Sequence, residues 1–144
     1  MSLFSALSVG ASGMAAQRAR AELLVENLAN AETTRTPEGG PYRRKDVVFQ
    51  SSPAESPFSS VFGQEMEADN GVTVASVVTD TRDPEKRYMP GHPDADANGY
   101  VAFPRINPAE DSVDLLAASR SFEADVAAIT AVKDMIQRSI NLLT

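Results

Sequence analysis

The sequence predicts an α+β protein in which long N- and C-terminal helices pair as a coiled-coil-like domain, with a small β-rich middle module. Three observations lead to this prediction. Apolar residues recur every seven positions near both ends of the chain. The stretch between them instead carries short valine-rich and aromatic-rich runs separated by proline, glycine and serine. We therefore expect residues 1–32 and 107–144 to form one helical domain and residues 33–106 to form the middle module.

The N-terminal helix is expected over residues 3–30, where the apolar positions follow a seven-residue repeat. Many of the other positions are small, and Gly10 and Gly13 each cost about 1 kcal/mol relative to alanine in a helix interior. Such a helix is marginal alone and needs a partner face in order to fold. The apolar candidates for subunit contacts in this helix are Leu7, Met14, Leu24 and Leu28.

The middle of the chain combines turn-forming residues with short runs of β-forming residues. Valine and aromatic residues predict the strands, while proline, glycine, serine and threonine predict the loops. Strands this short can enclose only a small core in a small sheet. We expect strands at 47–49, 71–79 and 99–103, and loops at 30–41, 51–60 and 80–93.

A basic triplet, Arg43, Arg44 and Lys45, precedes the first predicted strand and, together with Arg35, is the positive cluster of an otherwise acidic chain. Two interpretations remain open. The triplet is either a solvated loop or a contact with an acidic surface on a neighbouring subunit. We include its three residues among the candidate interface residues.

The C-terminal helix has the strongest signal in the sequence. Asn107 is a favourable N-cap residue, Pro108 suits the first helical position, and neither proline nor glycine occurs from Ala109 onwards. About 35 helical residues at about 1.5 Å each give a rod of roughly 50 Å, longer than a compact globule of this size. We therefore expect an elongated molecule. The candidate interface residues of this helix are Leu115, Phe122, Val126, Ile129, Ile136, Ile140 and Leu143.

Composition excludes several classes of function. The net charge of −7 disfavours nucleic-acid binding through phosphate contacts. The absence of cysteine excludes disulfides and thiolate metal sites. No run approaches the ~20 apolar residues of a membrane span, and the first residues lack the basic and apolar regions of a signal peptide. We expect neither nucleic-acid binding nor direct membrane insertion.

One stretch matches the opening of a calcium loop, from Asp94 to Gly99. The twelfth position of such a loop should be a bidentate glutamate, and it is Arg105 here, so an acidic turn is the better interpretation. His92, the single histidine, lies in a turn-rich run without a partner motif. No catalytic spacing of residues is present, and we expect no enzyme activity, no metal and no cofactor.

Three motifs resemble the bacterial flagellar rod proteins. Residues 27–33, Asn-Leu-Ala-Asn-Ala-Glu-Thr, resemble the NxANxxT signature of rod, hook and related axial proteins. The continuation from Arg35 to Lys45 resembles the proximal-rod type more specifically. Residues 118–125 are similar to the family motif ASRxYEAN, with Phe122 and Asp125 in place of tyrosine and the final asparagine.

The resemblance implies a structural subunit of the flagellar basal-body rod that polymerises through its terminal helices into a torque-transmitting shaft. It adds Asn27 and Asn30 to the candidate interface residues. It also implies export through the flagellar type III apparatus without a cleaved signal peptide, and assembly in the periplasmic space. The implied partners are copies of the chain, other rod subunits, and the membrane-embedded ring or its adaptor.

Other interpretations remain open at this point. A soluble coiled-coil adaptor or secretion-chaperone-like binding module would also carry two amphipathic helices, and it predicts a discrete complex of fixed stoichiometry. A sister rod subunit, or the inner rod of a virulence secretion system, would share the terminal motifs. The stretch from Gly39 to Lys45 argues against both of these by resemblance.

Overall fold

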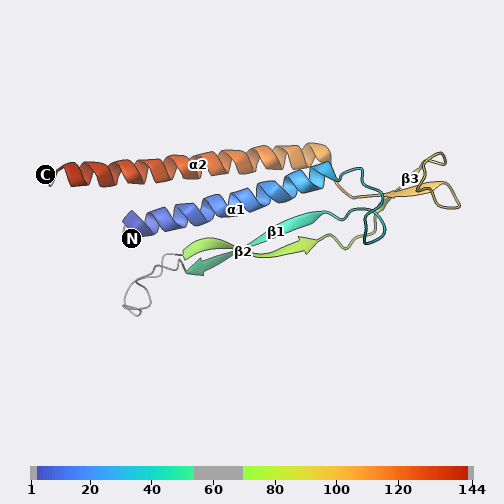
Figure 1. The fold of residues 1–144 in the computed structure, drawn as a ribbon, viewed down its shortest axis with the longest axis horizontal. Helices are drawn as coiled ribbons and strands as arrows, with labels where there is room; N and C mark the ends of the chain where they lie inside the picture. Colours follow the sequence, from blue (N-terminus) through green and yellow to red (C-terminus); the bar gives the residue numbers. More distant parts are fainter. Residues whose placement is uncertain (1–2, 54–69, 143–144) are drawn as a thin grey trace.

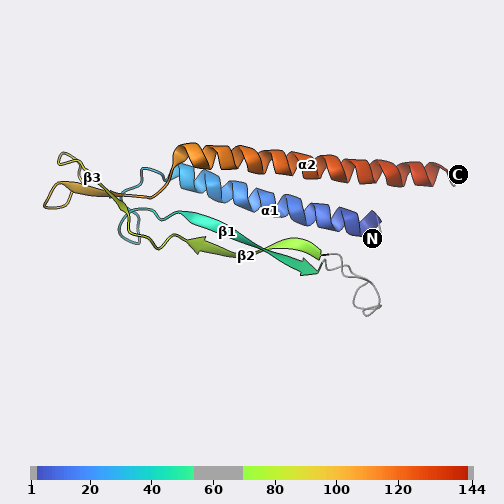
Figure 2. The ribbon, with the colours of Figure 1, turned by 180° about the vertical axis from the view of Figure 1, so that it is seen from behind.

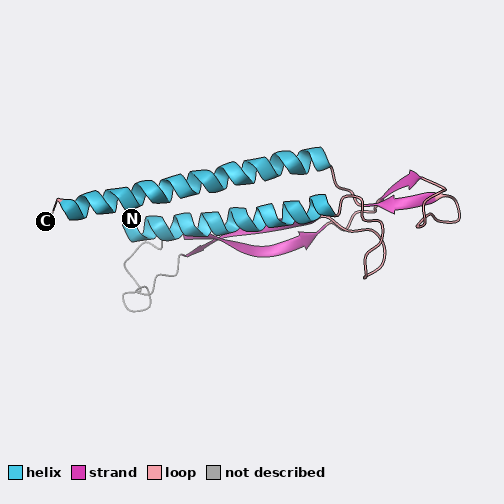
Figure 3. Ribbon diagram, turned by 45° about the horizontal axis from the view of Figure 1, so that its top comes forward, coloured by secondary structure: helices cyan, strands magenta, loops and turns pink. Residues whose placement is uncertain are grey.

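The computed structural model describes residues 3–53 and 70–142 and shows an elongated molecule (Figures 1 and 2). Two long antiparallel helices lie side by side, one strand pair lies along the first helix, and a second strand pair projects beyond the helix ends (Figure 3). The predicted α+β architecture is confirmed. The elements are α1 (Leu3–Ala29), β1 (Lys45–Pro53), β2 (Asn70–Thr79), β3 (Glu85–Tyr88), β4 (Tyr100–Phe103) and α2 (Pro108–Asn141).

Helix α1 forms the middle layer of the molecule. It contacts α2 on one side and the β1–β2 pair on the other, and it buries Ala16 and Leu24 between these elements. The helix ends at Ala29, one residue earlier than the sequence predicts, because Asn30 closes its last turn. The Asn30 backbone N–H and side-chain Nδ2 both donate to the carbonyl of Glu26, at 3.1 and 2.9 Å.

The β1–β2 pair is a twisted antiparallel ribbon that confirms both predicted strands. Val47 pairs with Val77, and a β-bulge between Val48 and Phe49 shifts the register. Strand β1 runs on to Pro53, so the predicted loop at 51–60 is wrong at its first three residues. The rest of that predicted loop lies outside the described residues.

The β3–β4 pair is a separate two-stranded sheet, whereas the sequence predicts one small sheet. Strand β3 falls inside the predicted loop at 80–93, and that prediction is wrong there. Tyr88 packs edge-on against Tyr100 at 5.4 Å between ring centroids, and the Arg87 guanidinium lies 4.9 Å from the centre of the Phe103 ring. These cross-strand contacts, with Val101 buried in β4, hold the pair together.

Helix α2 begins as the sequence predicts. The Asn107 side-chain Oδ1 accepts a hydrogen bond of 3.2 Å from the Ala109 backbone N–H, and Pro108 occupies the first helical position. The described part of the helix buries only two residues completely, Asp111 and Ala118. Neither described helix is long and apolar enough to cross a membrane.

Candidate functional site

Two glycines of α1 face side chains of α2 at close range. A Cβ atom added at Gly10 would lie 2.9 Å from Cγ1 of Ile129, and one added at Gly13 would lie 3.1 Å from Oδ2 of Asp125. The Ile129 side chain would have to move to admit a Cβ atom at position 10, whereas at position 13 the end of the Asp125 side chain would need only a small shift. Gly10, which weakens α1 as an isolated helix, therefore suits the packing of the pair, and Gly13 does so to a smaller extent.

We expect Gly10→Leu to destabilise the protein by about 1–3 kcal/mol, because the new side chain forces Ile129 and α2 away from α1. The measurement is the free energy of unfolding in urea. Ala11→Leu is the matched control, since Ala11 is exposed on the next position of the same helix and should change stability by less than about 0.5 kcal/mol. Equal effects of the two substitutions would contradict the close contact.

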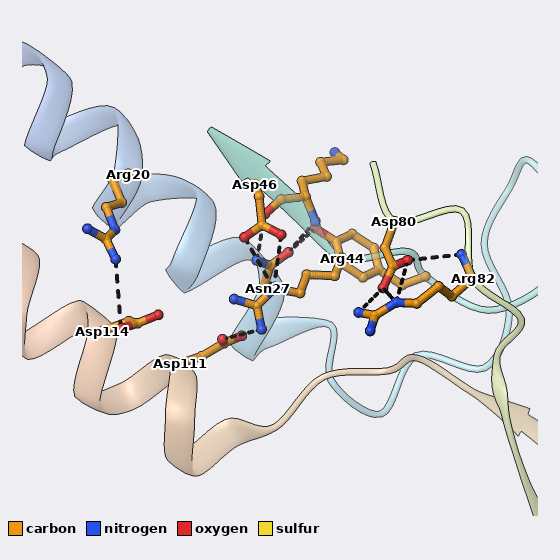
Figure 4. Close-up of polar contacts among 10 residues, drawn as sticks. Arg20, Asn27, Arg44, Asp46, Asp80, Arg82, Asp111 and Asp114 are labelled. Atoms are coloured by element: carbon orange, nitrogen blue, oxygen red, sulfur yellow. Dashed lines mark hydrogen bonds and ion pairs between the residues drawn. The ribbon is translucent and has the colours of Figure 1, made fainter. Parts of the chain in front are cut away.

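Asn27 joins α1 to the start of β1 from a completely buried position (Figure 4). Its Nδ2 donates to the carbonyl of Lys45 at 2.9 Å, and its Oδ1 accepts from the Lys45 backbone N–H at 3.0 Å. The Tyr42 hydroxyl donates to the same Oδ1 at 3.0 Å. The amide thus pairs with Lys45 as a neighbouring strand would, and it sets the position of β1 on the helix.

Tyr42 is itself buried beside this amide. Burial is the main cause that raises the pKa of its hydroxyl to about 12, and the nearby Glu26 carboxylate adds to the effect. Tyr42 therefore remains a neutral hydrogen-bond donor to Asn27 throughout the physiological pH range.

A buried ion pair joins the start of α2 to the same strand. Arg44 Nη1 lies 2.8 Å from Asp111 Oδ1, and Arg44 Nε lies 3.2 Å from Asp46 Oδ1 (Figure 4). The Asp111 side chain is completely buried, and neither of its oxygens accepts a well-oriented hydrogen bond from a described residue. Arg44 therefore neutralises Asp111 mainly by charge.

Burial has opposite effects on the two partners. It raises the pKa of Asp111 above its usual range, and Arg44 only partly offsets this. Burial lowers the pKa of Arg44, but the charges of Asp46 and Asp111 outweigh it and raise that pKa overall. Asp111 is thus a carboxylate that depends on Arg44 for its charged state.

The loop after α1 is tied to the acidic turn that resembles a calcium loop. Asp94 Oδ2 accepts a 2.8 Å hydrogen bond from the Thr34 hydroxyl, and Asp94 Oδ1 lies 3.8 Å from Nη1 of Arg35. Asp96 Oδ1 accepts backbone hydrogen bonds from Asn98 and Tyr100. Asp94 thus links the turn to the loop after α1, and Asp96 closes the turn itself. No group of three or more potential metal ligands occurs among the described residues.

The basic triplet is divided among three roles. Lys45 Nζ lies 2.6 Å from Glu26 Oε1, and Arg44 pairs with Asp46 and Asp111. Arg43 is exposed and donates only to the backbone carbonyl of Asp80, at 3.0 Å. Two of the three charges are thus used within the subunit, and one remains available to a partner.

The remaining predicted interface residues lie along the two helices at different depths. Leu24 and Asn27 are buried within the subunit. The half-buried members are Leu7, Met14, Leu28, Asn30, Leu115, Ile129 and Ile136. The exposed members are Phe122, Val126 and Ile140. Leu143 lies outside the described residues.

The sequence does not reveal the side chains that bind Asn27 and Arg44. Tyr42 and Asp111 gave no signal of burial, because a tyrosine in a loop and an aspartate in a first helical turn are both common at surfaces. Arg82 and Arg105 were not connected with Arg43 because they come from distant segments. Only the fold brings these side chains together.

The two terminal helices pair side by side and leave large apolar side chains of α2 exposed, as expected of a protein that packs against other chains. The family model for the C-terminal part of flagellar basal body rod FlgEFG proteins matches residues 97–142. This match covers less than half of the chain and indicates the class of flagellar basal-body rod proteins, which the full-length relatives then show.

Full-length relatives narrow this class. The chain is 41% identical to the flagellar basal-body rod protein FlgC of Bacillus subtilis over 99% of both chains. It is 37% identical to FlgC of Borreliella burgdorferi over 99% of both chains, and 38% identical to FlgC of Salmonella typhimurium over 99% of this chain and 98% of that protein. The chain belongs to the FlgC family. It is a structural subunit of the flagellar basal-body rod, and it assembles with other rod components.

Proposed function

We propose that this subunit polymerises through its terminal helices, with the outer faces of α1 and α2 packed against helices of neighbouring subunits. Residues 1–32 and 107–144 then form the core of the proximal rod, and residues 33–106 pack outside it. Repeated heterologous contacts of this kind build tubes and filaments instead of closed dimers. The role is mechanical, as one tier of a torque-transmitting shaft, without catalytic turnover.

The exposure of α2 carries this proposal. In a helix of 34 residues, only Asp111 and Ala118 are buried. Helices in proteins gain most of their stability from packing an apolar face, and large exposed apolar surfaces mark interaction sites. The large apolar side chains of α2 that are 37–67% exposed are Val113, Leu116, Phe122, Val126, Met135 and Ile140.

The proposal is tested by making the exposed apolar face polar. We expect Val126→Gln with Ile140→Gln to leave the free energy of unfolding of the monomer within about 0.5 kcal/mol, since both side chains are half-exposed. The same double variant should fail to build rods in cells, as seen by electron microscopy of basal bodies. Ala127→Gln is the control, because Ala127 is exposed one turn from Glu123 on the charged face. Normal rods with the double variant would reject helix packing as the assembly contact.

The proposal includes the route and the surroundings of the subunit. The chain would leave the cell unfolded through the flagellar type III export apparatus, without a cleaved signal peptide, and would assemble in the periplasmic space. The absence of cysteine supports this route, since no disulfide can block threading. Its partners there would be copies of itself, other rod subunits, and the membrane-embedded ring or its adaptor.

The proposal also concerns how far the terminal helices are folded in the free subunit. Because α2 has so few buried residues, the free subunit is expected to complete the folding of its arms on contact with neighbours. Unassembled subunits would then remain soluble until they reach the growing rod.

A further inference from the structure

Four arginine residues surround a small hollow at the junction between the helices and the β3–β4 pair. The hollow has a volume of about 20 Å³, room for one water-sized group. Prolines and the buried Tyr42 form its apolar walls, and Asp80 is its single carboxylate. The side chains of its polar lining are Arg43, Arg44, Asp80, Arg82 and Arg105.

Two of the four arginine charges are neutralised within the subunit. Arg44 pairs with Asp46 and Asp111. Arg82 Nη2 lies 2.6 Å from Asp80 Oδ2, and its Nε contacts both oxygens of that carboxylate (Figure 4). Hydrogen bonds from Arg82, with a smaller contribution from the charge of Arg105, lower the pKa of Asp80 to about 2. Asp80 is therefore ionised and already engaged.

The other two arginine charges have no carboxylate partner among the described residues. Arg43 donates only to the Asp80 backbone carbonyl, and Arg105 forms no ion pair there. Both side chains are exposed. Arg43 and Arg105 are exposed and lack an ion-pair partner of their own there, so at the surface of the hollow they can bind one carboxylate through paired N–H donors.

We propose that Arg43 and Arg105 bind a carboxylate side chain from a second copy of this chain. This inference rests on the proposed polymerisation and names one of its contacts. A second copy is the matching partner, because the chain has 20 acidic residues against 13 lysine and arginine residues. Glu123 and Asp134 are exposed on α2 and form no ion pair among the described residues.

The two halves of this contact lie on different parts of the subunit. The arginine hollow is lined by residues of the segments 41–44, 80–84 and 104–105, whereas Glu123 and Asp134 lie further along α2. A contact between unlike surfaces is heterologous, so that each copy has one donor site and one acceptor site left for the next copy. Such a contact adds subunits in one direction and fits a growing rod.

A zero-length crosslinking experiment tests the contact in assembled basal bodies. Arg105→Lys keeps the positive charge and adds an amine, which a water-soluble carbodiimide joins to any carboxylate that it touches. We expect a new species of twice the monomer mass, with residue 105 linked to an Asp or Glu of another copy in its peptide map. The natural contact between Lys45 and Glu26, at 2.6 Å, is the internal positive control. Arg87→Lys is the matched control, because Arg87 lies off the helices on β3, is paired with Glu85 at 3.0 Å and should crosslink only within its own chain.

A second variant tests the same contact without crosslinking, in case the lysine and the carboxylate are not positioned to react. Arg105→Glu should prevent incorporation of the chain into basal bodies by repelling the partner carboxylate, whereas Lys86→Glu, at an exposed position of β3 away from the helices, should be incorporated normally. Normal incorporation of Arg105→Glu, or a link from residue 105 only to its own chain or to a different protein, would overturn the inference and leave the rod function intact. Absence of the unmodified chain from basal bodies would overturn both.

Discussion

Asn27→Ala is expected to lower the free energy of unfolding by about 3 kcal/mol. The substitution removes the partner of the Lys45 N–H, the Lys45 carbonyl and the Tyr42 hydroxyl in one step. A buried polar group left without its hydrogen bond costs about 1–3 kcal/mol. Because Lys45 is only partly buried, about 1 kcal/mol applies to each of the three groups, which together give the expected loss. Urea unfolding followed by circular dichroism measures the change.

The location of the lost protection against amide exchange distinguishes a broken link between α1 and β1 from general destabilisation of the helix. Amide exchange at Lys45 and along β1 should accelerate in Asn27→Ala, while exchange around Gly10 should stay as it is in the unmodified protein. Asn30→Ala is the matched control, since it removes only the bonds that close the last turn of α1 and should cost about 1 kcal/mol. Similar losses from both substitutions would refute the role of Asn27 as the link between the helix and the strand.

The helices could be predicted from the sequence because their signals are local. Asn107 and Pro108 fix the start of α2, and heptad spacing continues without interruption through Ile136. Strand β3 could not be predicted, because Glu85 to Tyr88 shows no alternation and all four residues are exposed. Its structure depends on β4, which lies over ten residues further along the chain. Pairing between distant segments overrides local propensity in such short strands.

The candidate site could be predicted only in part, for the same reason. The heptads and the NxANxxT pattern identify Asn27 as a residue of interest, but they do not show that its amide binds Lys45. The basic triplet looks uniform in the sequence, whereas the structure separates a buried Arg44 from an exposed Arg43. Which charge is free depends on where Glu26 and Asp111 come to lie, and that is decided by the packing of α1 and α2.

The Arg44–Asp111 pair should respond very differently to the removal of each partner. Arg44→Met is expected to cost about 3–5 kcal/mol at pH 7, because it leaves the buried Asp111 carboxylate without its cation. Asp111→Asn should cost less than about 1 kcal/mol, because it also removes the charge that burial opposes. Arg44→Met with Asp111→Asn should recover most of the stability that the single Arg44→Met variant loses. Urea unfolding at pH 7 measures all three variants, and a double variant no more stable than Arg44→Met would disprove the uncompensated charge.

The pH dependence of the free energy of unfolding tests the buried charge of Asp111 in a second way. Burial raises the pKa of Asp111 above its ordinary value of 3.8, so its contribution to stability is largest when it is protonated and is lost as the pH rises through the raised pKa. Removal of Arg44 takes away the charge that lowers this pKa. The pH range in which Asp111 stays protonated then extends to higher pH. The instability of Arg44→Met should therefore shrink as the pH falls from 7 towards 4, whereas Arg44→Met with Asp111→Asn should show no such recovery. A constant difference between the two variants across this range would mean that Arg44 stabilises the junction by packing and not by neutralising Asp111.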